Sequence, residues 1–255
     1  MLRRLRPAAR QLLGVRREST YYLPWLTRPG LDCVVLLNNI ESRFTSGRDA
    51  RDIAATVTQI DAGGRVVAEH RATLTDSTDA REVRLTADGV AYGLVTVTAP
   101  RIRSDLYVAL ADGETYTATH GRHEFVEHYP PWTRAALAVA GALLALFGHT
   151  LPTFTRDQYV YHGAEGRSHL LLFNLSNIVN RIRIDARRDG RRVGARLIRV
   201  PPRGARLVDV DSLAPRTGPL TVEQLRLTGN AWFNLYLIGA GARDLDGALS
   251  LMHVK

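Results

Sequence analysis

Hydrophobic residues recur with a period of two along most of the chain from Leu31 onward, which is typical of β-strands. Segment 33–37 is a buried type of strand, and segment 53–60 alternates between apolar and polar residues. The turn at 61–64 contains two glycines, which supply the positive φ of a tight hairpin, so 53–60 and 65–69 are predicted to pair. Short strands with turn signals every 8–12 residues or so are typical of an antiparallel β-sandwich.

The second half of the chain repeats the order of strands and turns found in the first half. The matched segments are 169–174 with 34–38, 183–193 with 58–66, and 232–238 with 105–110. We therefore predict an all-β protein of two tandem antiparallel β-sandwich modules, Ig-like or jelly-roll-like, joined by a short apolar helix. The predicted divisions are a basic arm at 1–18, a first module at 19–129, the linker helix within 130–153, and a second, basic module at 154–255.

This order of strands and turns resembles the sensory rhodopsin transducer family and similar small bacterial β-sandwich modules. In the second half the resemblance lies in residues 172–174, 182–193, 201–206 and 241–244, and it covers about one module. The resemblance implies a non-enzymatic sandwich that can oligomerise, and it assigns no ligand.

An apolar segment without any charged residue separates the two predicted modules. Residues 135–148 are all apolar or glycine, Pro130 and Pro131 suit the start of a helix, and Gly148 suits its end. The segment is shorter than the ~20 residues of a membrane span. A helix that is apolar on all sides is expected to be buried away from water, so it could lie between the modules, in an oligomer interface or at a membrane surface. The predicted interface residues are Leu137, Leu143, Leu144, Leu146 and Phe147.

Composition narrows the class of protein and its compartment. Of the 255 residues 45% are hydrophobic, which is enough to build packed cores. Cys33 is the single cysteine, so no intrachain disulfide can form. Residues 1–18 are basic but lack the apolar run of a secretory signal, and read as a surface-binding arm, an organelle presequence or a frayed terminus. We expect a cytoplasmic protein, with membrane association left open.

Positive charge is concentrated at the N-terminus and in the second module. Residues 1–18 carry a net charge of +5, residues 19–153 carry −3, and residues 154–255 carry +7. Arginines pair well with phosphate, sulfate or carboxylate, so a polyanion such as nucleic acid, acidic polysaccharide or anionic lipid could bind here. The alternative is a solvated outer face that Asp185 and Asp189 partly neutralise. The predicted anion-binding residues are Arg181, Arg183, Arg187, Arg188, Arg191 and Arg192.

Motifs of catalysis are weak in this sequence. His120, His123 and His128 could bind a metal ion, but they do not match the spacing of H-E-x-x-H, and a solvated loop at 120–128 is the favoured interpretation. The chain has no G-x-S-x-G nucleophile motif, and Gly239-Ala240-Gly241-Ala242 reads as a turn rather than a phosphate loop. We therefore predict a protein that is not an enzyme and has no cofactor.

The favoured function is a structural or interaction protein that associates with itself, or with another protein, through its sandwich surfaces and the apolar helix. The alternative is a module that binds an acidic polymer or a carbohydrate through the arginine-rich second module. Aromatic residues at 21–25 could form a sugar platform, but packing in a core or at the module junction is the favoured interpretation. Membrane contact through 135–148 remains a further alternative.

Overall fold

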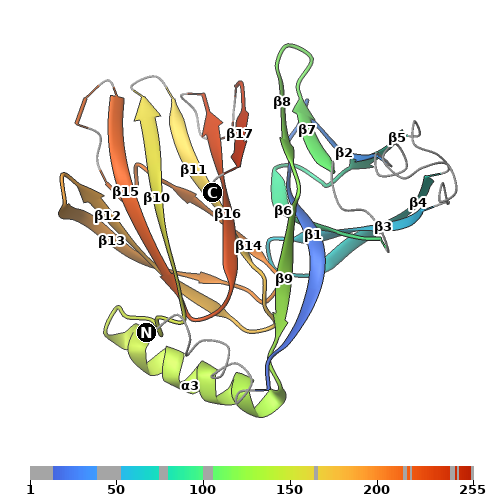
Figure 1. Cartoon of the computed structure of the whole chain (residues 1–255). Helices are drawn as coiled ribbons and strands as arrows, with labels where there is room; N and C mark the ends of the chain where they lie inside the picture. The colour runs from blue at the N-terminus through green and yellow to red at the C-terminus, as the bar shows by residue number, and fades with distance from the viewer. Residues whose placement is uncertain are drawn as a thin grey trace, which may run out of the picture.

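The structure, a computed structural model, describes residues 14–38, 53–74, 80–99, 106–163, 166–214, 217–218, 220–241, 245 and 247–253. In these residues seventeen strands form four antiparallel sheets, arranged as two sandwiches, and one helix lies outside the sheets (Figure 1). The prediction of an all-β protein with two modules and a short helix is confirmed.

The first module contains a sheet of order β4-β3-β6-β1-β9 and a sheet of order β5-β2-β7-β8. On β3, Ala55, Val57 and Gln59 are buried while Thr56 and Thr58 are half-buried, so the period of two in the sequence separates an inner face from an outer one. The strands are β1 (Arg16–Thr27), β2 (Asp32–Asn38), β3 (Ile53–Asp61), β4 (Val66–Leu74), β5 (Ala80–Leu85), β6 (Ala91–Thr98), β7 (Tyr107–Ala111), β8 (Tyr116–His120) and β9 (Arg122–His128).

The second module contains sheets of order β10-β15-β12-β13 and β14-β11-β16-β17. This repeats the strand order of the first module, with β10 to β17 in the places of β1 to β8, and β9 is the additional strand. The β3–β4 and β12–β13 hairpins even share a register shift close to their turns. The strands are β10 (Phe154–Gly163), β11 (Arg167–Asn174), β12 (Asn180–Arg188), β13 (Arg191–Val200), β14 (Ala205–Asp209), β15 (Leu220–Gly229), β16 (Phe233–Ala240) and β17 (Ser250–His253).

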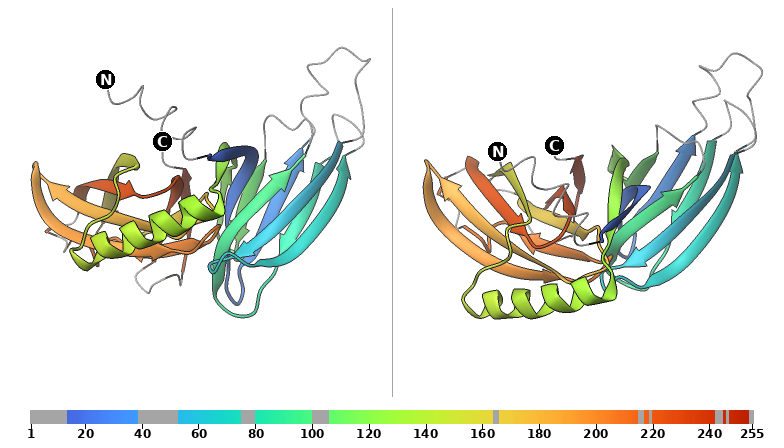
Figure 2. Two further views of the ribbon diagram at one scale, coloured as in Figure 1. Left: turned by 90° about the horizontal axis from the view of Figure 1, so that it is seen from below. Right: turned by 60° about the horizontal axis from the view of Figure 1, so that its bottom comes forward.

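The two modules lie side by side (Figure 2), and buried side chains of both belong to one hydrophobic core. On β11, Leu170 and Leu172 pack into the core of the second module, whereas Leu171 and Phe173 pack into the core that contains β1 and β3. The Tyr22 ring of β1 lies edge-on to Phe173, with ring centroids 5.7 Å apart. Because both faces of β11 are buried, its sequence is a continuous apolar run instead of an alternating one.

Two turns press together at this junction. The backbone N–H of Ala205 donates to the carbonyl of Ala62 at 3.1 Å. Gly64 has φ +87°, and a Cβ there would lie 2.0 Å from the carbonyl oxygen of Pro202. Glycine is therefore required both by the backbone conformation and by the close approach of the second module.

The prediction of a solvated loop at 120–128 was wrong. Residues 122–128 form β9, which pairs antiparallel with β1 from Arg16↔His128 to Tyr22↔Arg122. Arg16, Arg17 and Glu18, the last residues of the predicted arm, therefore belong to a strand, while residues 1–13 lie outside the described residues. The β9 pattern is hard to recognise because its buried residues, Val126 and Glu127, are adjacent and one of them is charged.

Candidate anion-binding pocket

Helix α3 (Pro131–Leu146) lies against one end of the second module (Figure 1). Pro131 at its first position has no N–H to leave unpaired, and Gly148, with φ +68°, follows its end as the sequence predicted. Thr133 and Gly141 are its buried residues. Leu137 is half-buried and packs on a small cluster of Tyr129, Ile178 and Ala231. The helix thus buries only a narrow stripe, which is centred on small residues.

Strand β12 fixes the C-terminal end of this helix. The Arg183 guanidinium donates to the carbonyl of Gly148 and also to the carboxylate of Asp185, at 3.1 Å to each oxygen. The hydroxyl of Thr150 donates to the carbonyl of Arg181 at 2.6 Å. A cation at the carbonyl end of a helix is also favoured by the helix dipole. Arg183 therefore has a structural role.

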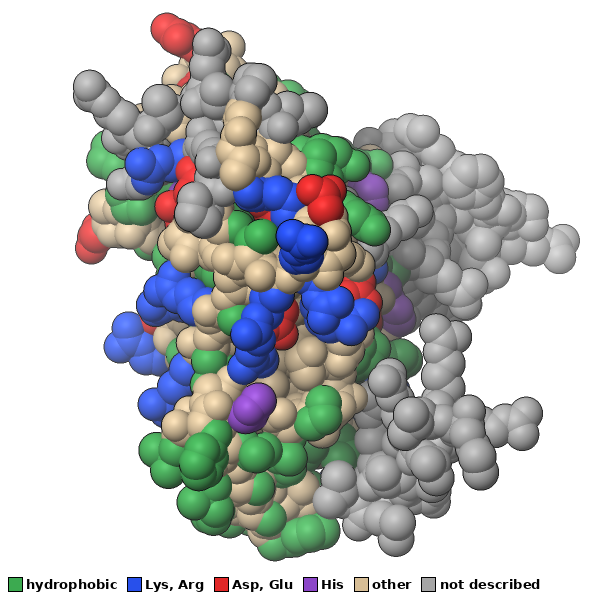
Figure 3. All heavy atoms as spheres, turned by 90° about the vertical axis from the view of Figure 1, so that its left-hand side faces the viewer, with side chains coloured by type: hydrophobic (Ala, Val, Ile, Leu, Met, Phe, Trp, Pro, Cys, Tyr) green, Lys and Arg blue, Asp and Glu red, His purple; other side chains and the backbone are tan. Residues whose placement is uncertain are grey.

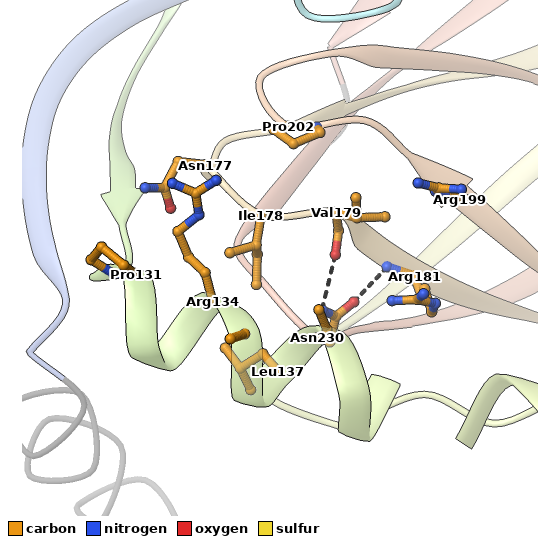
Figure 4. A pocket seen from close by; sticks show the side chains of 12 residues that line it. Pro131, Arg134, Leu137, Asn177, Ile178, Val179, Arg181, Arg199, Pro202 and Asn230 are labelled. Carbon is orange, nitrogen blue, oxygen red and sulfur yellow. Dashed lines mark hydrogen bonds between the residues drawn. The ribbon is translucent and has the colours of Figure 1, made fainter. Parts of the chain in front are cut away.

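A pocket of about 540 Å³ lies between α3 and the second module (Figure 4). Its walls come from the first half of α3, the loop before β12, and the ends of β12, β13 and β15. Among the described residues that line it, three are arginines and none is an aspartate or a glutamate. The lining residues are Pro131, Arg134, Ala135, Leu137, Ala138, Asn177, Ile178, Val179, Arg181, Arg199, Pro202 and Asn230.

The positions of the three arginines follow from local structure. Arg181 and Arg199 are cross-strand partners on the outer face of the β12–β13 hairpin, and Arg134 projects from the first turn of α3. Arg181 lies along the helix, where a Cβ on Gly141 would be 3.1 Å from its Nη1. In the described part of the chain, none of the three guanidinium groups has a hydrogen bond or an ion pair. The pocket is therefore positively charged without internal compensation.

Two asparagines shape the rest of the pocket. The side-chain oxygen of Asn230 accepts from the Arg181 backbone N–H, and its amide donates to the carbonyl of Val179 at 3.1 Å. Asn177 is bonded in the same reciprocal way to the backbone of Tyr129, at 2.8 and 3.0 Å. These bonds anchor the loop before β12 both to its own module and to the start of α3. The pocket wall is thereby tied to fixed backbone.

The predicted arginine set divides in the structure. Arg181 lines the pocket, while Arg183 holds the helix end. Arg188 forms an ion pair with the fully buried Glu223. The guanidinium of Arg192 lies 3.8 Å from a carboxylate oxygen of Asp185. Of the remaining two, Arg187 is half-buried and Arg191 is exposed on the hairpin, and neither lines the pocket.

The spacing of arginines in the sequence did not reveal the pocket. It missed Arg134, and it selected arginines that already have carboxylate partners. Arg199 is not among the six predicted anion-binding residues, although it is the cross-strand partner of Arg181 in the β12–β13 hairpin.

The predicted interface residues also divide into two groups. Leu137 and Leu144 are half-buried on the side of α3 that faces the second module. Leu143, Leu146 and Phe147 are 58%, 79% and 76% exposed. Trp132 and Val139, which share this outer side of the helix, are 59% and 63% exposed. An apolar surface therefore runs along the whole outer side of α3.

The three histidines do not converge. His128 lies 3.2 Å from the carboxylate of Glu18, and His123 contacts the hydroxyl of Ser19 and stacks at a tilt on Tyr21. His120 is on β8, beside Tyr107. Among the residues that the structure describes, no three histidine, cysteine, aspartate or glutamate side chains are grouped so that they could hold a metal ion.

A second hollow, of about 230 Å³, lies where the outer face of β1, β3, β4 and β6 meets the second module. Three threonines from β3 and β6 line it, together with Glu18, Glu69 and Arg203. Its charges are mixed, so it has no clear preference for an anion. The pocket beneath α3 is the better candidate for a binding site.

No protein-family model and no curated protein sequence matches this chain. A solved structure of a glycosyl hydrolase family 2 member from Bacteroides cellulosilyticus is 12% identical, with a TM-score of 0.16. That match covers 93% of this chain and 28% of the hydrolase, so this chain spans little more than a quarter of that protein. A likeness of this size defines neither a fold nor an activity.

Proposed function

We propose that the protein is a non-catalytic interaction protein that binds an anionic group of its partner, such as a phosphate, in the pocket beneath α3. The observation that carries this proposal is the set of three arginines, Arg134, Arg181 and Arg199, in a pocket that no carboxylate of the described residues lines. Guanidinium groups bind phosphate and carboxylate oxygens through paired hydrogen bonds. Their uncompensated charge is best explained by an anion that arrives with the partner.

Calorimetric titration of the full chain with pyrophosphate tests this proposal. We expect saturable binding that is lost in the triple variant Arg134→Gln, Arg181→Gln, Arg199→Gln. A matched control removes the same charge elsewhere, at Arg71, Arg191 and Arg206, which are exposed and do not line the pocket. The control also contains one of the arginines that the sequence favoured.

Arg181 contacts α3, so its loss could disturb the fold as well as binding. The double variant Arg134→Gln, Arg199→Gln changes exposed side chains only, and it should weaken binding while leaving the melting temperature unchanged. Equal binding by the pocket variants and the control would overturn the proposal, and so would an absence of binding by the unmodified protein at low salt.

Self-association remains a prediction of the sequence. The residues that would support it are the exposed apolar ones on α3, above all Leu146 and Phe147. Light scattering over a range of protein concentrations measures it directly, and a constant monomer mass would rule it out.

A further inference from the structure

Helix α3 is unusual because its outer side is apolar and exposed, while the pocket at its inner side holds arginines whose guanidinium groups have no hydrogen bond or ion pair in the described part of the chain. Trp132, Val139, Leu143, Leu146 and Phe147 are each more than half exposed. Figure 3 shows hydrophobic side chains gathered at the end of the molecule where α3 lies, with basic side chains beside them. Single exposed apolar residues are ordinary on protein surfaces, but a contiguous apolar patch usually marks a binding surface.

The geometry indicates which surface this patch fits. The helix lies along the molecule's exterior (Figure 2), and its exposed apolar residues are on the side opposite the buried Thr133 and Gly141. The pocket opens beside the helix. Arg134, which belongs to α3, and Arg181 of β12 line this pocket, while Trp132 and Phe147 are exposed at the outer side of the same helix segment. No aspartate or glutamate occurs between Glu127 and Asp157, so α3 itself carries no negatively charged side chain. An apolar helix side next to cationic groups is typical of helices that lie in the interface of an anionic bilayer.

The length of α3 limits the mode of binding. No helix in the described part of the chain is long and apolar enough to cross a membrane. With 16 residues and a rise of about 1.5 Å per residue, α3 is shorter than the hydrocarbon core is thick. It is also fixed to the second module through Arg183 and Thr150. A helix held in this way can enter a bilayer only sideways, to the depth of its outer side chains.

We infer that α3 docks the protein on membranes that contain anionic phospholipids. The outer apolar side chains enter the interface, and the pocket arginines bind lipid phosphates. This inference rests on the proposed function, because it identifies the anion in the pocket as a lipid headgroup. Trp132 is placed to report the event, because Trp25 is fully buried and Trp232 is partly buried.

Vesicle sedimentation of the full chain tests this inference. We expect binding to vesicles of phosphatidylcholine mixed with phosphatidylglycerol, and little binding to phosphatidylcholine alone. The triple variant Arg134→Gln, Arg181→Gln, Arg199→Gln should partition about a hundredfold more weakly, since each arginine near an anionic surface contributes about 1 kcal/mol. The variant Leu143→Ser, Leu146→Ser, Phe147→Ser should partition onto these vesicles at least about tenfold more weakly. A matched control is Val66→Ser, Val90→Ser, Met252→Ser, which removes exposed apolar residues elsewhere and should bind normally.

The outcomes separate the two proposals. If pyrophosphate binds but vesicles do not, the pocket proposal holds and the membrane inference fails. If the serine variant of α3 binds vesicles normally, the attraction is electrostatic only and the inference also fails. If the same variant converts a dimer to a monomer in light scattering without any change in vesicle binding, the patch serves a second copy of the chain instead. A blue shift of the Trp132 fluorescence on binding, absent from a Trp132→Phe variant, supports insertion.

Discussion

Gly64 offers a sharp test of the packing between the modules, because a matched glycine exists elsewhere. Gly64 and Gly113 have φ of +87° and +90°, which L residues disfavour equally. Alanine at either position should cost about 1–2 kcal/mol for its backbone conformation alone. A Cβ on Gly113 would meet nothing within 4 Å, whereas one on Gly64 would lie 2.0 Å from the Pro202 oxygen. The difference between the two variants therefore isolates the contact between the modules.

The extra cost at Gly64 can be worked from the junction. The two turns must separate by more than an ångström, which breaks the hydrogen bond from Ala205 to Ala62 at a cost of about 0.5–1.5 kcal/mol. Strain in the surrounding packing adds about 1–3 kcal/mol. Gly64→Ala should then lower the free energy of unfolding by roughly 1.5–4.5 kcal/mol more than Gly113→Ala.

Urea unfolding of both variants, followed by circular dichroism, measures this difference. Because Leu171, Phe173 and Tyr236 belong to the same core as β1 and β3, we also expect a single cooperative transition for the unmodified protein. Equal destabilisation by the two alanines would show that the turns do not press together. Two separate transitions would contradict the shared core.

Other predictions concern buried tyrosines and the helix end. The Tyr22 hydroxyl is buried and has no hydrogen-bond partner among the residues that the structure describes, whereas that of Tyr236 donates to the carbonyl of His120 at 3.1 Å. Tyr22→Phe should therefore stabilise the protein and Tyr236→Phe destabilise it, each by about 1 kcal/mol in urea unfolding. Burial raises the pKa of both hydroxyls, so only the unfolded chain ionises them above pH ~10, and stability should fall there by up to about 1.4 kcal/mol per pH unit for each tyrosine. Tyr22→Phe should reduce that slope, and an unchanged slope would contradict the assignment. Arg183→Gln should cost about 1–2 kcal/mol and speed hydrogen exchange near Gly148, whereas Arg191→Gln should do neither.

The sequence predicted most of the fold because alternation records which face of a strand is buried. It identified β3, β4 and their hairpin, and it aligned β11, β12 and β16 with their counterparts in the first module. It did not identify β1 as a strand, since both faces of that strand are buried beyond Thr20 and no alternation remains. It also missed β15, although Val222 and Glu223 alternate in exposure there. In that strand a buried glutamate that pairs with Arg188 breaks the expected pattern of polarity.

The candidate site was harder to predict, because it depends on contacts between distant segments. Spacing placed Arg181 and Arg183 on the same face of β12, but only the fold shows that Arg183 binds Gly148 and Asp185. Arg134 joins Arg181 because α3 packs against the second module through Gly141. Residues 135–148 are all apolar or glycine, so the sequence alone does not indicate which side of the helix is buried and which side is exposed.

A crystal structure of the protein with selenate would show whether the pocket beneath α3 binds an anion, because the anomalous signal of selenium locates the anion. We expect a selenate ion in the pocket beneath α3, with its oxygens within hydrogen-bonding distance of the Arg181 guanidinium and of Arg134 or Arg199. Anion density on the β12–β13 hairpin near Arg191, with an empty pocket, would contradict this expectation.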